Sequence, residues 1–188
     1  MDKRSALIAA ARAAMIEQKG NVEIGDVARR AGVSVGLAYH HFGSKAGLVA
    51  AVVTEFYDRY DDIVMQDMGR GRPWLERERE RLVRIVDFLF HDPLTPIILG
   101  QLSGSPEVAQ IEFGRRGKII ESAAWVIERG QEKGELDPSL DPYVTAAIFT
   151  GGLREACNRW IARGDPPDAE LFVSRSWRIM AAGLAPKN

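Results

Sequence analysis

Apolar residues recur at every third or fourth position along most of this chain, which is the spacing that lines one face of an α-helix. The first segment shows this pattern at Leu7, Ile8, Ala11, Ala14 and Met15. Hardly any stretch alternates strictly between apolar and polar residues, as a half-buried strand would. The pattern therefore predicts an all-helical (all-α) protein.

Glycine and proline residues divide this pattern into nine segments of helical length. Three short segments come first, at about 2–19, 24–31 and 34–42. Six more follow, at about 44–69, 74–91, 94–102, 106–133, 141–162 and 165–182. We therefore expect a small group of three helices followed by a larger group of six.

The composition is that of an ordinary globular protein. Of the 188 residues, 46% are hydrophobic and 27% are charged. No stretch approaches the 18 or so consecutive apolar residues of a membrane-spanning helix, so we expect no membrane insertion. The single cysteine, Cys157, excludes an internal disulfide or a cysteine-rich metal site and favours a cytoplasmic location. We interpret it as a buried small hydrophobe and expect no metal or cofactor.

The charge is distributed unevenly along the chain. The formal net charge is −1, but the first 50 residues carry +3 and the remaining 138 carry −4. A small basic head on a larger acidic body indicates that only the head contacts an anionic partner.

Residues 24–42 have the spacing of a helix-turn-helix motif. Gly32 suits a tight turn with a positive φ angle, and Ser34 is a good N-cap for the second helix. Tyr39, His40 and Lys45 carry a hydroxyl, an imidazole and an ammonium group that could reach phosphate oxygens. The spacing alone leaves a second interpretation open, because many glycine-linked helix pairs are purely structural.

The same stretch resembles the N-terminal signature of the tetracycline-repressor (TetR) family. The matching elements are Val27-Ala28, Ala31-Gly32-Val33-Ser34, Gly36, Tyr39, His41-Phe42, Ser44-Lys45 and Leu48. The resemblance covers residues 5–50 closely. Further along, only weak features agree, at Gly130, Gly134-Glu135-Leu136, Asp141 and Gly152.

The resemblance implies a three-helix helix-turn-helix DNA-binding domain at 1–46 and a six-helix effector-binding and dimerisation domain at 47–188. It also implies a ligand-responsive transcriptional regulator without catalytic activity. We expect a repressor that binds a palindromic double-stranded DNA operator as a homodimer and is released by a small-molecule effector. Dimerisation fits the low charge of the head, since affinity for DNA depends on how many phosphates are neutralised.

Carried over to this chain, the family pattern assigns the DNA contacts to seven residues. Tyr39, His40 and Lys45 would hold the DNA backbone, and Val35, Gly36 and Leu37 would approach base edges at the start of the helix that Ser34 caps. Such an apolar start offers few hydrogen-bond donors to guanine, so we expect its direct readout to be contact with thymine methyl groups.

Two further positions depart from the family pattern. Where the family usually has a capping threonine or serine, this chain has Val22 and Glu23. Either Asn21 or Glu23 must then supply the cap and the phosphate contact, or that contact is absent. Gly47 replaces a better helix former and should cost up to about 1 kcal/mol relative to alanine.

The last two segments are apolar over more than one face, which favours a dimer interface over a monomeric core. The expected interface residues are Val144, Ile148, Gly152, Trp160, Phe172, Trp177 and Met180. An effector pocket between helices would be lined by Phe56, Tyr60, Phe88, Ile120, Trp125 and Phe149. For each pocket residue, ordinary core packing is the alternative.

Two other function classes have less support than the regulator. An enzyme lacks support, because the three histidines include the adjacent pair His40-His41, which cannot share one helical face as metal ligands do. A helical ligand-binding or adaptor protein that has lost DNA binding is the alternative, and the apolar Val35-Gly36-Leu37 run supports it.

Overall fold

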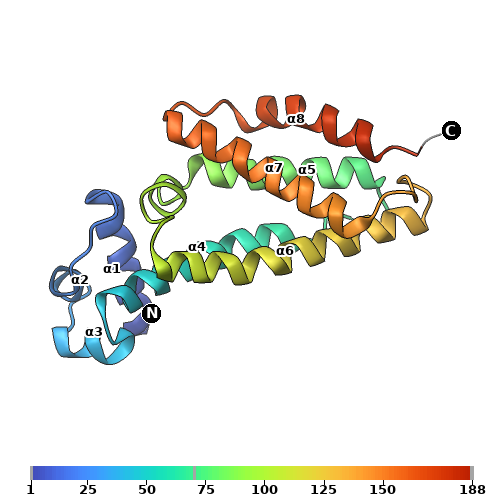
Figure 1. The fold of residues 1–188 in the computed structure, drawn as a ribbon. Coiled ribbons are helices and arrows are strands. Elements are labelled where there is room, and N and C mark those ends of the chain that lie inside the picture. Colours follow the sequence, from blue (N-terminus) through green and yellow to red (C-terminus); the bar gives the residue numbers. More distant parts are fainter. Residues whose placement is uncertain (1, 70, 187–188) are drawn as a thin grey trace. The chain divides into compact units, whose positions relative to one another are not determined.

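The computed structural model describes residues 2–69 and 71–186, and all regular structure in these ranges is helical (Figure 1). The α-helices are α1 (Lys3–Glu17), α2 (Ile24–Arg30), α3 (Val35–Phe42), α4 (Lys45–Met65), α5 (Trp74–His91), α6 (Pro106–Glu132), α7 (Pro142–Arg163) and α8 (Ala169–Leu184). A short π-helix, η1 (Ile97–Gln101), lies between α5 and α6. The prediction of an all-helical fold is confirmed.

Side-chain caps fix where four of these helices begin. The carboxylate of Asp2 accepts a hydrogen bond from the backbone N–H of Ser5 at 2.9 Å and so caps α1. Asp141 and Asp168 cap α7 and α8 in the same way, and Ser34 caps α3. Each cap satisfies an N–H group that has no partner within its own helix, so these starting points follow from the local sequence.

Helix α4 ends at Met65, four residues before the expected end at Gly69. The guanidinium of Arg81 explains the difference, because it donates hydrogen bonds to the carbonyl oxygens of Val64 and Gln66. These carbonyls are among those that a helix end leaves without internal partners. Gly69 instead turns the chain with a φ of 88°.

The segment expected as an α-helix at 94–102 forms the π-helix η1 instead. Pro93 and Pro96 do not prevent an α-helix here, because they lie before and within its first turn, where backbone N–H groups have no partner inside the helix. The backbone N–H of Leu102 donates to the carbonyl of Ile97 at 2.9 Å, five residues back.

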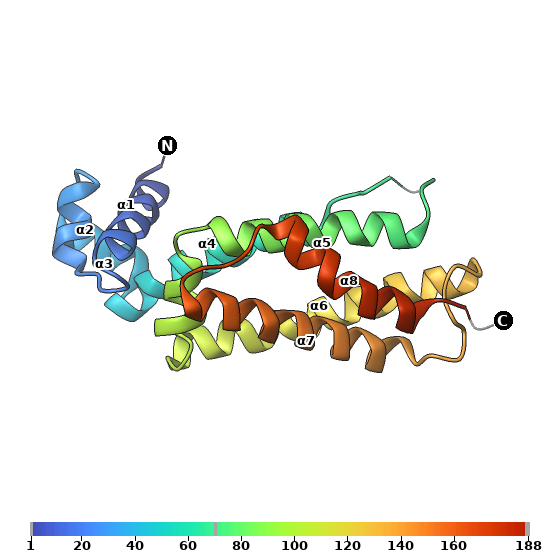
Figure 2. The ribbon, with the colours of Figure 1, turned by 90° about the horizontal axis from the view of Figure 1, so that it is seen from above.

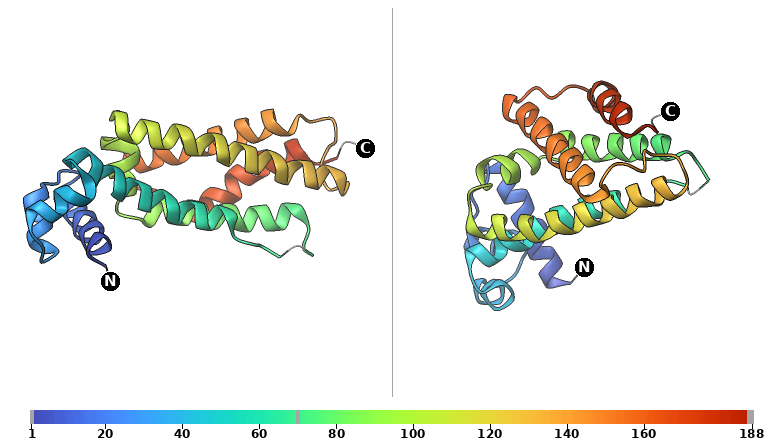
Figure 3. Two further views of the ribbon diagram at one scale, coloured as in Figure 1. Left: turned by 90° about the horizontal axis from the view of Figure 1, so that it is seen from below. Right: turned by 45° about the vertical axis from the view of Figure 1, so that its right-hand side comes forward.

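The chain folds as two compact units. The first contains the described residues up to Asp61 together with Asp92–Glu112, and the second contains Asp62–His91 together with the described residues from Phe113 onward. In the first unit α1, α2 and α3 pack on one another, drawn in blue in Figure 3. The boundary predicted at residue 46 stays a prediction.

The core of the second unit is built around Trp74 at the start of α5. Its indole N–H donates to the carbonyl of Val126 at 3.0 Å, and its ring stacks on that of Trp177 with a centroid distance of 6.4 Å. The buried residues Ile127, Leu136, Ala146 and Leu184 surround it. Helix α8 packs on α5 and so closes this core (Figure 2).

Candidate nucleic-acid interface

The three-helix head has a small core of its own. Leu7, Ala11 and Met15 of α1 are fully buried, as are Val27 and Ala28 of α2. The core therefore fixes α1 and α2 against each other and supports α3 from one side. Of the eight residues of α3, only Ala38 is buried.

The turn between α2 and α3 depends on Gly32. Its φ angle is 67°, in the left-handed region that glycine adopts without strain. The N–H of Gly32 donates to the carbonyl of Arg29 at 3.2 Å, and the N–H of Val33 donates to the carbonyl of Ala28 at 3.0 Å. The turn thus ends α2 and aims the chain into α3, as the spacing predicts.

Helix α3 presents most of its surface to solvent. The hydroxyl oxygen of Ser34 accepts a hydrogen bond from the N–H of Leu37 at 3.2 Å, which fixes the start of the helix. Val35 is 44% exposed, and Gly36 beside it is also exposed. Leu37 is half-buried. The start of the helix therefore offers a short apolar surface.

Tyr39 and His40 extend this surface toward the end of α3. Tyr39 is 51% exposed, and His40 is exposed as well. Both side chains can therefore reach a partner without rearrangement of the core. Their neighbour Phe42 is half-buried, and the guanidinium of Arg4 lies 5.6 Å from the centre of its ring.

Lys45 opens α4 beside this surface and is already engaged by the loop before α2. Its Nζ lies 2.7 Å from Oε1 of Glu23 and 3.3 Å from Oδ1 of Asn21. Glu23 is the N-cap residue of α2, but its side chain makes no capping hydrogen bond. Glu23 and Asn21 thus bind the ammonium of Lys45, which the local sequence pattern did not predict.

The junction of α3 and α4 explains why Gly47 is a glycine. A Cβ atom at this position would lie 2.0 Å from the backbone oxygen of Phe42. The N–H of Gly47 also donates to the hydroxyl oxygen of Ser44 at 3.0 Å. The close approach of the two helix ends therefore requires a residue without a side chain, which is a reason that helix propensity alone does not reveal.

Other basic side chains of the head are also paired with acidic ones. The carboxylate of Asp26 accepts hydrogen bonds from Arg29 and Arg30, and Arg30 also contacts Glu17 at 2.8 Å. The hydrogen bond from Arg30 is the main cause that lowers the pKa of Asp26. These arginines therefore lie in a network on α1 and α2, and their charge is balanced locally.

Asp92, directly after α5, ties two helices of the first unit together. Its Oδ2 accepts hydrogen bonds from Nη2 of Arg12 at 3.3 Å and from Nη1 of Arg59 at 2.6 Å. Its Oδ1 accepts from the N–H of Leu94 at 2.8 Å. Because Asp92 is only 8% exposed, these contacts anchor α1 and α4 to the segment that follows α5.

The residues predicted to line an effector pocket lie in both units. Phe56 is fully buried and Tyr60 half-buried in the first unit, on α4. Phe88, Ile120 and Phe149 are half-buried in the second. Trp125 is 57% exposed, and the guanidinium of Arg129 lies 5.4 Å from its ring.

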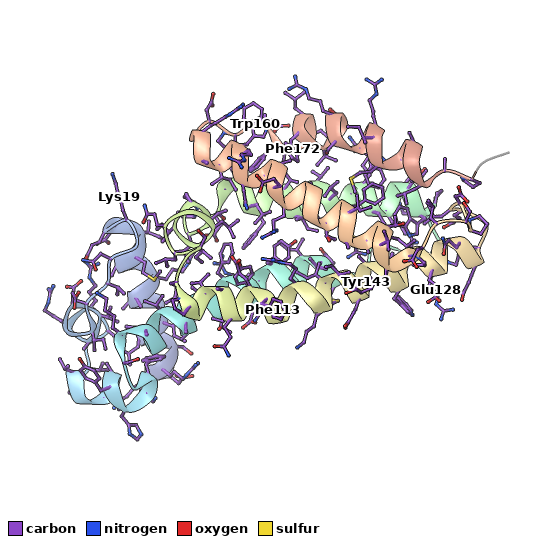
Figure 4. All side chains as sticks on the ribbon, in the orientation of Figure 1. Lys19, Phe113, Glu128, Tyr143, Trp160 and Phe172 are labelled. Atoms are coloured by element: carbon purple, nitrogen blue, oxygen red, sulfur yellow. The ribbon has the colours of Figure 1, made fainter. Side chains whose placement is uncertain are left out.

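The residues predicted to form a dimer interface differ in their exposure. Val144 and Ile148 are strongly exposed on α7, and Gly152 is exposed on the same stripe. Phe172 of α8 is buried and packs edge-on against Phe90 at 5.3 Å (Figure 4). Trp177 packs against the core of its own unit.

The two remaining interface candidates, Trp160 and Met180, are half-buried. Trp160 lies on α7, labelled in Figure 4, with the Arg163 guanidinium 4.9 Å from its ring. Leu171 and Ile179, which belong to the broad apolar arc of the last helix, are also exposed on α8. Tyr143 is exposed on α7 and was not predicted. Tyr143 directly precedes the predicted Val144, and this neighbouring position was the available signal in the sequence.

Two kinds of site are absent from the described residues. None of the helices at 2–69 and 71–186 is long and apolar enough to cross a membrane. Within the same residues, no three His, Cys, Asp or Glu side chains gather as metal ligands would.

Comparisons with known proteins agree with this geometry. Residues 7–52 match the family model described as bacterial regulatory proteins, tetR family. The chain is 29% identical to the HTH-type transcriptional regulatory protein RaaS of Mycobacterium tuberculosis, over 75% of this chain and 66% of that protein. It is 27% identical to the A-factor receptor protein of Streptomyces griseus, over 86% of this chain and 56% of that protein.

The chain thus spans less than two-thirds of the length of either relative. The fold also matches a solved structure, that of the fatty acid degradation regulator FadR from Bacillus halodurans. The TM-score is 0.78 at 20% sequence identity, covering 100% of this chain and 98% of FadR.

Proposed function

Because this chain is a member of the tetR family of bacterial regulatory proteins, we propose that it is a ligand-responsive transcriptional regulator that binds operator DNA. The observation that carries the proposal is the exposed surface of α3, which begins at a capped N-terminus and runs to Tyr39. A rigid, solvent-facing helix on a three-helix support is the arrangement that enters the major groove in helix-turn-helix proteins.

The proposed contacts divide into two kinds. Tyr39, His40 and Lys45 contact phosphate oxygens and fix the position of the head on the duplex. Val35 and Leu37 lie at the start of α3, where the family's reading helix meets base edges, and they offer apolar contact to thymine methyl groups. Gly36 between them allows the backbone to approach a base edge closely.

We propose that two copies bind a palindromic operator together through α7 and α8. This part of the proposal is supported by apolar side chains that face solvent, with Val144 at 54%, Ile148 at 63% and Ile179 at 76% exposure. Exposed apolar residues at helical spacing on neighbouring helices are typical of a subunit interface. A two-fold axis through such an interface sets the separation of the two heads.

An aspartate in this surface tests the dimer. Ile148→Asp should convert the dimer to a monomer in sedimentation equilibrium, because a buried unpaired carboxylate opposes association. Phe113→Asp on α6 is the matched control, since Phe113 is 80% exposed and lies outside the proposed interface. An Ile148→Asp variant that remains dimeric contradicts this assignment.

The effector is proposed to be a small molecule bound among the helices of the body. The name of one relative, the A-factor receptor protein, describes a receptor and supports effector binding. Phe88, Ile120 and Phe149, the half-buried candidates of the second unit, remain the proposed lining. An effector shifts DNA binding only by binding one arrangement of the heads more tightly than another. The proposal includes no catalytic step, and we expect the protein to act in the cytoplasm.

Selection of genomic fragments on the full chain tests DNA binding directly. The wild-type protein should enrich fragments that share one palindrome, and Tyr39→Ala should lose most of this enrichment. The matched control is Phe113→Ala, which also removes an exposed aromatic ring but on α6. If wild type and Tyr39→Ala enrich the same fragments equally, α3 is not the reading element.

A ligand-binding protein without DNA binding is the second candidate. It is favoured by the apolar start of α3 and by the acidic partners that already engage Arg29, Arg30 and Lys45. In this case the same selection enriches no fragment at 50 mM salt, while small molecules still raise the melting temperature of the chain.

A further inference from the structure

The ammonium of Lys45 is held by side chains from the loop between α1 and α2. Nζ lies 2.7 Å from a carboxylate oxygen of Glu23 and 3.3 Å from the amide oxygen of Asn21. Both charged side chains face solvent, at 47% exposure for Lys45 and 65% for Glu23. The pair therefore lies on the surface of the head, beside the start of α4.

This arrangement affects any phosphate that Lys45 binds. A phosphate oxygen needs the same approach to Nζ that the Glu23 carboxylate now occupies, at the distance of a charge-assisted hydrogen bond. A carboxylate that stays in place would also lie next to the phosphate, and like charges at such short range repel. The ammonium must leave Glu23, or bind phosphate against this repulsion.

Within residues 2–69 and 71–186, the side chain of Glu23 has no second contact that explains its position. It is the N-cap residue of α2, yet its side chain makes no capping hydrogen bond. Its contact with Lys45 joins residues 22 positions apart in the sequence. An exposed ion pair of this kind contributes little to the stability of a fold, so the carboxylate is free to serve binding.

We infer that Glu23 limits the DNA affinity of this protein by competing with operator phosphate for the ammonium of Lys45. The inference rests on the proposed function and adds a residue that sets affinity and salt dependence. Asn21 orients the ammonium without adding charge. Replacing Glu23 by glutamine keeps a hydrogen-bond acceptor near Nζ and removes only the negative charge.

The expected effect follows from counterion release. If each protomer gains one fully engaged phosphate, the slope of log K against log salt steepens by about 0.9 per site, or roughly 2 for a dimer. Removal of the competing charge should raise affinity about threefold at each site, within the range of up to about fivefold for an exposed pair, and so about tenfold at two sites at 50 mM NaCl. The gain should shrink as salt increases.

The experiment is a fluorescence anisotropy titration of full-length protein with a fluorescein-labelled 30-base-pair duplex of random sequence, from 50 to 300 mM NaCl. The variants are Glu23→Gln, Lys45→Ala and the double mutant. The matched control is Glu55→Gln, which removes one carboxylate from α4 ten residues beyond Lys45. This separation is about 15 Å along the helix, which is more than the Debye length at 0.1 M salt.

The inference predicts that Glu23→Gln binds about tenfold more tightly with a steeper salt slope and that Glu55→Gln stays within twofold of wild type. The gain should disappear when Lys45 is alanine. An unchanged affinity of Glu23→Gln, with wild type bound, overturns the inference. A gain that persists fully in the Lys45→Ala background overturns it too, because Glu23 would then act without Lys45.

Failure of the proposed function looks different. If neither wild type nor Glu23→Gln binds any duplex at 50 mM NaCl, DNA binding itself is refuted, and this inference falls with it. If wild type fails to bind but Glu23→Gln binds in a manner that requires Lys45, the competition is supported. Circular dichroism melts of every variant exclude misfolding as the cause.

Discussion

Substitution of Gly47 by alanine tests the packing of α3 against α4. Helix propensity alone predicts that alanine in this first turn stabilises the protein by up to about 1 kcal/mol. The structure predicts the opposite sign. The added Cβ would lie 2.0 Å from the carbonyl oxygen of Phe42 and 3.2 Å from its carbonyl carbon, whereas non-bonded heavy atoms attract best at about 3.5–4.0 Å.

The magnitude depends on what can move. The obstructing atom is a backbone oxygen at the end of α3, so relief needs a shift of more than about 1 Å between two helix ends. Overpacking of this kind costs about 1–3 kcal/mol, and a rigid obstacle favours the upper half of that range. After the propensity gain, we expect Gly47→Ala to be destabilised by about 1–2 kcal/mol.

Urea unfolding of the full chain, followed by circular dichroism, measures this change. The matched control is Gly25→Ala, because Gly25 also lies in the first turn of a helix of the same unit. Apart from its own helix and its chain neighbours, no described atom lies within 4 Å of the position that a Cβ would take at Gly25. We expect the control to be as stable as wild type or slightly more stable. A Gly47→Ala protein that matches its control would refute the close approach of the two helices.

Three further predictions concern other parts of the chain. Asp92→Asn should destabilise the protein by about 1.5–3 kcal/mol in urea unfolding, because the guanidinium groups of Arg12 and Arg59 lose a buried anionic partner. A change below about 0.5 kcal/mol would contradict this prediction. Burial raises the pKa of Cys157 from 9.0 to about 12, so N-ethylmaleimide should modify this thiol at pH 8 only after unfolding. The free energy of unfolding should also fall as the pH rises from 9.0 to about 12, because the thiol loses its proton in the unfolded chain first. In mobility-shift assays, Tyr39→Phe and Lys45→Ala should weaken binding to all duplexes by a similar factor, whereas Leu37→Ala should change which duplex sequence is preferred. If Lys45→Ala weakened binding to one duplex sequence and left the others unchanged, the phosphate role of Lys45 would be contradicted.

The elements that the sequence predicted well depend on interactions between near neighbours. Ser34 caps α3 through a residue three positions away, and Gly32 turns the chain by its own φ angle. Helix α5 runs from Trp74 to His91, as its apolar spacing predicts. The glycine, proline and capping signals act over one turn of helix, so they can be recognised without knowing the fold.

The interactions that the sequence did not predict join distant segments. Lys45 and Glu23 are 22 positions apart, and Arg12 and Asp92 are 80 apart. No periodicity links such positions, because their contact depends on how helices pack. The same limit applies to Phe172 and Ile179 on α8, where one is buried and the other exposed although both belong to one broad apolar arc.

The charge of the head shows why this limit matters for function. Its net charge of +3 suggests several free cations, and affinity for DNA would scale with their number. Four of its seven basic side chains, however, already contact a carboxylate, namely Arg12, Arg29, Arg30 and Lys45. Arg12 is bound to a buried partner and cannot move to phosphate without breaking that contact, whereas Lys45 lies on the surface beside α3. The salt dependence of binding should therefore follow the state of Lys45 more closely than the charge of the whole head.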